Sequence, residues 1–191
     1  MTQSFNGKSG YRGWQTAAGV VLGMLIVPVI ALLYFRYGGP PVAVADTPFP
    51  FEAQIVHVPL NARTARDMPK TVPFAASEDV LEGGARVYRA QCAMCHGIPG
   101  TDAAFASHMF PVAPQLWRKH SNSDVVGVSD DEAGETYWKV ANGIRLTGMP
   151  SYNHLLSEKE MWQVSFVLKN ADQKLPSRVL TILNAKADET P

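Results

Sequence analysis

Two cysteines and a histidine lie within one short run, Cys92-Ala93-Met94-Cys95-His96, and the chain has no other cysteine. Each thiol can form a thioether bond to a vinyl group, and the histidine that follows can ligate a metal from one face. This C-x-x-C-H pattern is the attachment signature of covalently bound haem. An iron porphyrin with protein ligands exchanges electrons, so the run predicts both a cofactor and a redox role.

Other uses of the two cysteines agree less well with the sequence. A structural zinc site needs four ligands, and no second C-x-x-C is present. A thioredoxin-type dithiol leaves His96 without a role. A disulfide between Cys92 and Cys95 would close so short a loop that it would add little stability.

Two short runs follow the histidine in an informative order. They are Pro114-Gln115-Leu116 and Gly148-Met149-Pro150, and Met149 lies 53 residues after His96. Together with the C-x-x-C-H motif, this order resembles the class I monohaem c-type cytochromes. The resemblance implies that His96 and Met149 are the two protein ligands of the iron, and such ligation favours a high reduction potential. It also implies that the Pro114 carbonyl accepts a hydrogen bond from His96 and so orients the ring.

Other side chains compete for the position opposite His96. Met109 and His108 follow His96 so closely that little chain is left to cross the porphyrin, and Met161 lies in an expected helix. His120, His154 and an open iron site remain as alternatives. Pro111 is a neighbouring competitor for the role of Pro114.

Helical periodicity predicts three helices, over residues 78–90, 132–142 and 157–170. In the first, one stripe contains Val80, Leu81, Gly84, Val87 and Tyr88. Ser77 is expected to cap the first, and Asp130 or Asp131 the second, which Gly143 ends. Ser157 and Glu160 have the spacing of a capping box at the start of the third. Its buried face is expected to contain Trp162, Phe166 and Val167.

The resemblance covers residues 77–172 and implies an all-α, cytochrome c-like domain around one covalent haem. In that family a small residue and an aromatic, here Gly84 and Tyr88, let the first and last helices cross closely. Tyr137, Trp138 and Ala141 are expected to face the haem or its rim. Arg145 and Trp117 are candidate donors to the haem propionates. The loop over residues 97–113 is long for the family, which leaves the exposure of the haem edge open.

Residues 16–36 are expected to form a transmembrane anchor. Thr16–Phe35 contains 20 residues without a charge, enough for a helix to span a ~30 Å hydrocarbon core. Lys8 and Arg12 precede it, so the positive-inside rule puts residues 1–15 in the cytoplasm and the haem domain outside the bacterial inner membrane, in the periplasm. The alternative is a secretory signal cleaved after Ala45.

The remaining segments carry fewer signals. Residues 37–76 are rich in proline and are expected to form an extended tether, with a short strand possible over 53–60. Residues 173–191 are expected to form an irregular C-terminal tail. Beyond residue 45 acidic side chains outnumber basic ones, and the cluster Asp130, Asp131, Glu132 and Glu135 is a candidate for steering a basic redox partner. Nothing in the composition indicates nucleic-acid binding.

These observations predict a membrane-anchored monohaem cytochrome c that passes single electrons between redox partners in a respiratory-type chain. It would act as a tethered shuttle or as a subunit of a larger complex, and no catalytic base or nucleophile is apparent. The alternative is a haem enzyme or gas sensor whose sixth iron site is open or labile.

Overall fold

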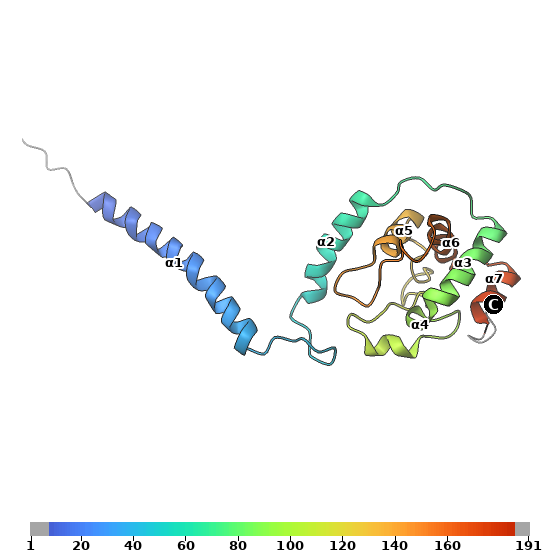
Figure 1. The fold of residues 1–191 in the computed structure, drawn as a ribbon, viewed down its shortest axis with the longest axis horizontal. Helices are drawn as coiled ribbons and strands as arrows, with labels where there is room; N and C mark the ends of the chain where they lie inside the picture. The colour runs from blue at the N-terminus through green and yellow to red at the C-terminus, as the bar shows by residue number, and fades with distance from the viewer. Residues whose placement is uncertain (1–7, 186–191) are drawn as a thin grey trace, which may run out of the picture. The chain divides into compact units, whose positions relative to one another are not determined.

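The computed structural model describes residues 8–185, and every regular element in that range is a helix. The chain divides into two compact units, one ending at Phe49 and the other beginning at Pro50. The prediction of an all-α fold with one apolar N-terminal helix is confirmed (Figure 1). Residues 1–7 of the expected cytoplasmic segment and residues 186–191 of the expected tail lie outside the described residues.

The first unit contains one long helix, α1 (Lys8–Tyr37). Within it, Gly13–Tyr37 reaches a mean hydropathy of 2.5, and that stretch is not buried in the protein. At a rise of about 1.5 Å per residue it is longer than the ~30 Å hydrocarbon core of a bilayer. By length and composition, α1 is therefore suited to cross a membrane.

The second unit begins with α2 (Glu52–Asp67), inside the segment expected to be an extended tether. For these residues the expectations of extended chain and of a short strand over 53–60 are wrong. The second half of α2 is rich in good helix formers, among them Ala62, Ala65 and Arg66. Thr64 is buried and α2 packs on α5 (Ala133–Asn142), so tertiary contact stabilises a helix that local periodicity did not reveal.

The centre of the second unit is a close crossing of α3 (Glu78–Gln91) and α6 (Glu158–Lys169). A Cβ atom on Gly84 would lie 2.1 Å from the backbone oxygen of Gln163, so the two backbones touch there. The crossing expected at Gly84 is thus confirmed. Most of the apolar residues expected on the inner faces of these helices are buried in the core: Leu81, Val87, Tyr88, Trp162, Phe166 and Val167. Val80, from the same predicted stripe, is only partly buried.

Helix α5 packs on α6 through aromatic side chains. The Tyr137 ring stacks on Trp162 with ring centroids 4.4 Å apart, so Tyr137 contacts the helical core. The N-cap of α5 is Glu132, and the expected caps Asp130 and Asp131 are wrong by one or two positions. The predicted end is confirmed, since Gly143 follows the last residue with φ of +66°.

A further helix, α7 (Ser177–Asn184), lies in the segment expected to be an irregular tail, so that expectation is wrong for these residues. Val179 and Leu183 are fully buried, and α7 packs along α3 (Figure 1). The side chain of Arg178 pairs with Glu82 at 3.3 Å. Val179 and Leu183 are thus buried against α3, a helix about 90 residues earlier in the chain.

The capping box at the start of α6 is confirmed. Ser157 Oγ accepts a hydrogen bond from the Glu160 backbone N–H at 3.3 Å, and the Glu160 carboxylate accepts one from the Ser157 N–H at 2.8 Å. The Ser157 hydroxyl also donates to the Glu160 carboxylate at 2.6 Å, and this bond, with the smaller contribution of the Ser157 N–H, holds the pKa of Glu160 below its ordinary value.

We expect Glu160→Ala to lower the free energy of unfolding by roughly 0.5 kcal/mol at neutral pH. Because the folded-state pKa is lowered, this contribution is present above the unfolded-state pKa and is lost as the pH falls through the folded-state pKa. Denaturant titrations at neutral and acidic pH measure the free energy of unfolding and test this. The control is Glu158→Ala, which removes one carboxylate from the same helical turn. Equal pH dependence of the two variants would contradict the prediction.

Candidate haem-binding site

The C-x-x-C-H run lies where α3 ends and the one-turn helix α4 (Ala93–His96) begins. Cys92 is the residue between the two helices, and its backbone N–H still donates to the Tyr88 carbonyl at 2.9 Å. The His96 backbone N–H donates to the Cys92 carbonyl at 3.0 Å, which closes the turn. The turn therefore presents two thiols and one imidazole from a backbone that α3 anchors in the core.

The electrostatics of Cys92 disfavour a thiol redox centre. Burial, with a smaller contribution from the neighbouring Cys95, raises the pKa of the Cys92 thiol to about 12. Reactive dithiols have lowered thiol pKa values, because the thiolate is the nucleophile. The environment of Cys92 therefore resembles that of a packed thiol and not of a thioredoxin-type nucleophile.

The His96 ring is oriented by the backbone of Pro114. The distance from His96 Nδ1 to the Pro114 carbonyl oxygen is 2.7 Å. Because a carbonyl oxygen can only accept, Nδ1 carries the proton and Nε2 keeps its lone pair. Burial lowers the pKa of His96, opposed by this hydrogen bond, so the neutral ring is favoured. The geometry is that of a metal-binding imidazole held by a carbonyl.

Gln115, the middle residue of the Pro114-Gln115-Leu116 run, ties this segment to the C-x-x-C-H turn. Its Nε2 donates to the carbonyl oxygen of Cys95 at 3.1 Å, and its Oε1 accepts from the Ala103 backbone N–H at 2.7 Å. Sequence reasoning overlooked Gln115. In the sequence, Gln115 is only an amide side chain between Pro114 and Leu116. The backbone groups of Cys95 and Ala103 that it bonds are distant in sequence, so no local pattern indicates its role.

Trp117 lies beside the C-x-x-C-H turn and provides a test of whether a haem fits. Its ring meets Tyr88 edge-on with centroids 5.5 Å apart, and Tyr88 Oη donates to the Gly97 carbonyl at 2.8 Å. Burial raises the pKa of Tyr88, and the nearby indole N–H of Trp117 partly offsets this rise. Yet among the described residues the buried Nε1 has no acceptor at hydrogen-bonding geometry.

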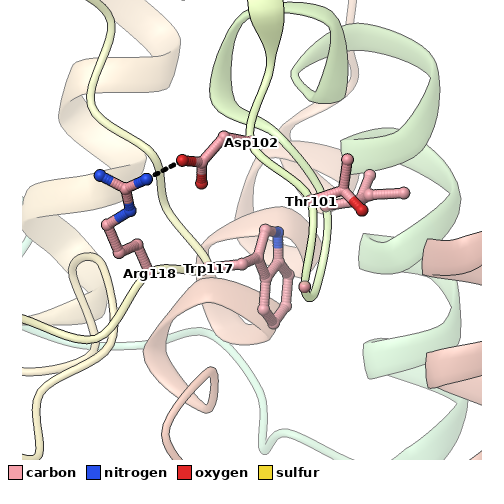
Figure 2. Close-up of a pocket in the computed structure, with 6 residues that line it drawn as sticks. Thr101, Asp102, Trp117 and Arg118 are labelled. Carbon is pink, nitrogen blue, oxygen red and sulfur yellow. Dashed lines mark hydrogen bonds and ion pairs between the residues drawn. The ribbon is translucent and has the colours of Figure 1, made fainter.

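Figure 2 shows Trp117 in a pocket also lined by Thr101, Asp102 and Arg118. Arg118 forms an ion pair with Asp102 at the edge of this pocket. A buried indole N–H without a protein acceptor fits an anionic group such as a haem propionate.

The run that contains Met149 is a tight loop with its own hydrogen bonds. Thr147 Oγ1 donates to the Ile144 carbonyl at 2.7 Å and accepts from the Met149 N–H at 3.1 Å. Met149 is half-buried and packs against the same hydrophobic core as Cys92 and Trp117. Arg145 is exposed and makes no ion pair within the described residues, so its expected role toward a propionate has no supporting contact.

The competing ligands lie in different surroundings. Met161 is in the core of α6 with 4 % of its surface exposed, as expected of a packing residue. His120 and His154 are exposed loop residues. His108 ends the short helix η1 (Ala104–His108), and Met109 follows it.

The residues present fit a covalent haem. Two thiols and an imidazole with a free Nε2 are the donor set of a haem c site, and the buried Trp117 N–H lacks an acceptor. Met149 supplies a thioether from the same core.

Comparison with known proteins agrees with this arrangement. Residues 79–165 match the family model described as cytochrome C oxidase, cbb3-type, subunit III. The match runs from the start of α3 into α6 and includes the C-x-x-C-H turn, Pro114 and Met149. No curated protein and no solved structure matches the chain.

Proposed function

We propose that residues 79–165, which match the cbb3-type cytochrome family model, form a c-type cytochrome domain, and that the chain is a membrane-anchored monohaem cytochrome that carries single electrons. In this proposal Cys92 and Cys95 bind the haem covalently, and His96 and Met149 ligate its iron. The observation that supports it most directly is the 2.7 Å contact between His96 Nδ1 and the Pro114 carbonyl, which leaves Nε2 free for a metal.

A bound haem supplies reversible one-electron exchange. The residues of this chain would keep that exchange fast by holding both ligands still. Pro114 fixes the plane of the His96 ring, and Gln115 ties the Pro114 segment to the Cys95 carbonyl. Thr147 holds the backbone of Met149. Trp117 would donate its indole N–H to a propionate, and Arg145 remains the second candidate donor.

We propose that α1 anchors the haem domain to the bacterial inner membrane, in line with its length and hydropathy. Lys8 and Arg12 precede the apolar stretch, so the positive-inside rule puts the N-terminus in the cytoplasm and the haem domain in the periplasm. The anchor corresponds to residues 16–36, and the segment that follows it would act as a tether only up to α2.

The partners we propose are redox proteins at the same membrane. The description of the matching family supports membership in a larger respiratory complex, and a tethered shuttle is the simpler alternative. The acidic cluster is a weak candidate for steering a partner. Lys139 pairs with Asp131 at 3.1 Å and with Glu135 at 2.7 Å. The positive charge of Lys139 therefore already offsets two of the four carboxylates in the cluster.

The test is the optical spectrum of the purified full chain, oxidised and reduced, beside that of Met149→Ala. We expect a weak far-red band from the iron–methionine bond in the oxidised wild type, and no carbon monoxide binding to the reduced wild type. Met149→Ala should keep covalent haem, lose the band, bind carbon monoxide and lower the potential by ~100 mV or more, within the range that axial ligands control.

Two results would contradict the proposal. A wild type that lacks the band and binds carbon monoxide readily would favour a haem enzyme or gas sensor with an open sixth site. A Met149→Ala variant that keeps the band would show that another side chain is the ligand.

A further inference from the structure

The loop that carries Met149 is touched from outside by a second methionine. A Cβ atom on Gly148 would lie 2.3 Å from the Cε methyl of Met109, and no other heavy atom of the described residues, apart from its two chain neighbours, would come within 4 Å of it. The Met109 side chain therefore lies directly over the backbone that precedes Met149. Met109 itself is half-buried, although its neighbours His108 and Phe110 are exposed.

The Met149 loop contains a strained residue and depends on outside contacts. Leu146 has φ of +62°, a left-handed conformation that is unfavourable for a bulky side chain, and it is 89 % exposed. Strained backbone of this kind persists only where the surrounding structure holds it. Thr147 provides hydrogen bonds within the loop, and Met109 provides a contact from a different segment.

Met109 is in turn connected to the opposite side of the site. Gln115 bonds both the Cys95 carbonyl and the Ala103 backbone N–H, and Ala103 directly precedes η1. Within that turn Ala106 is buried, and its carbonyl accepts from the Met109 N–H at 3.1 Å. A continuous set of contacts therefore runs from the C-x-x-C-H turn through η1 to the Met149 loop.

We propose that Met109 is a positioning residue that keeps the Met149 loop closed over the iron. This inference rests on the proposed function, because it takes Met149 as the sixth ligand. The Met109 thioether acts by packing on Gly148 and not by ligating the iron. A long, unbranched side chain suits this role, since it can follow an irregular backbone surface. The loop over residues 97–113, long for a class I cytochrome, is the segment that delivers it.

The test uses the full chain with haem bound and compares Met109→Ala, Met109→Leu and Phe105→Ala. Phe105 lies in the same loop and is 54 % exposed, so it is the matched control. The readouts are the far-red iron–methionine band and carbon monoxide binding to the reduced protein. Apparent affinity for carbon monoxide scales with the fraction of molecules whose sixth site is open.

We expect Met109→Ala to keep covalent haem and the band at 25 °C, and to bind carbon monoxide at least about tenfold more tightly than wild type. Met109→Leu should restore most of the protection, and Phe105→Ala should match wild type. The unfolding temperature of each variant is measured as well. Carbon monoxide binding is then compared well below that temperature, where a general loss of stability would leave the sixth site closed.

The outcomes separate the two proposals. Carbon monoxide binding by Met109→Ala that equals wild type would overturn the role of Met109 and leave Met149 as the ligand. A band that disappears in Met109→Ala but persists in Met149→Ala would make Met109 the ligand itself, which would overturn both. A wild type without the band would overturn the proposed function, and with it this inference.

Discussion

Replacing Cys92 and Cys95 together with serine is expected to abolish covalent haem attachment. The hydroxyl of serine forms no thioether, and the chain has no other cysteine to replace them. Serine is close in size to cysteine, so the loss follows from chemistry and not from a change in packing. Acid–acetone extraction should remove all haem from the double variant and none from the wild type, and a haem-stained denaturing gel should show the same.

The control for this experiment is Met94→Ser, which changes the same turn. Met94 lies between the two cysteines, and its side chain is 73 % exposed. We expect this variant to keep covalent haem at the wild-type level. Haem that survives extraction from the double cysteine variant would contradict the central assignment.

The second large effect is expected at the crossing of α3 and α6. A Cβ atom on Gly84 would lie 2.1 Å from the Gln163 backbone oxygen, which no side-chain rotation can relieve. Gly84→Val should therefore force the helices apart and cost about 3 kcal/mol of unfolding free energy, with a fall in Tm of roughly 10 °C. Thermal and denaturant unfolding of the haem-bound protein measure this.

Gly83 offers a matched control one residue earlier in the same helix. The three atoms nearest to a Cβ atom there all belong to the amide end of the Gln163 side chain, the closest at 2.3 Å. That group can move, and alanine is a better helix former than glycine by about 1 kcal/mol. Gly83→Ala should therefore stay within about 1 kcal/mol of wild type. If Gly84→Val were equally mild, the close crossing would be wrong.

Features set by neighbouring residues could be predicted from the sequence. The C-x-x-C-H run is a local pattern, because two thioethers and an iron ligand must come from one helical turn. The Ser157–Glu160 capping box is local as well, since both hydrogen bonds join residues three apart. The periodic apolar stripe of α3 likewise predicted that Leu81, Val87 and Tyr88 are buried.

Other contacts between distant segments could not be predicted, because neither a local pattern nor the family resemblance indicates them. Helix α2 and helix α7 have weak or short apolar patterns, and each becomes stable by packing on a helix that is remote in sequence. Two of the backbone groups that bond the Gln115 side chain are 12 and 20 residues away. Met109 and Gly148 contact each other from two loops, where no helical or strand periodicity indicates which residues meet.

The sequence by itself determined the chemistry of this protein: the pair of thiols, the imidazole that follows them, and the apolar stretch of the first helix. The tertiary structure alone decided how that chemistry is held. The Gln115 side chain ties the Pro114 segment to the Cys95 carbonyl, and the Met149 loop is covered by a methionine from another segment. The physical reason is that covalent bonding groups are a property of residue type, whereas orientation and exclusion of solvent come from packing between segments.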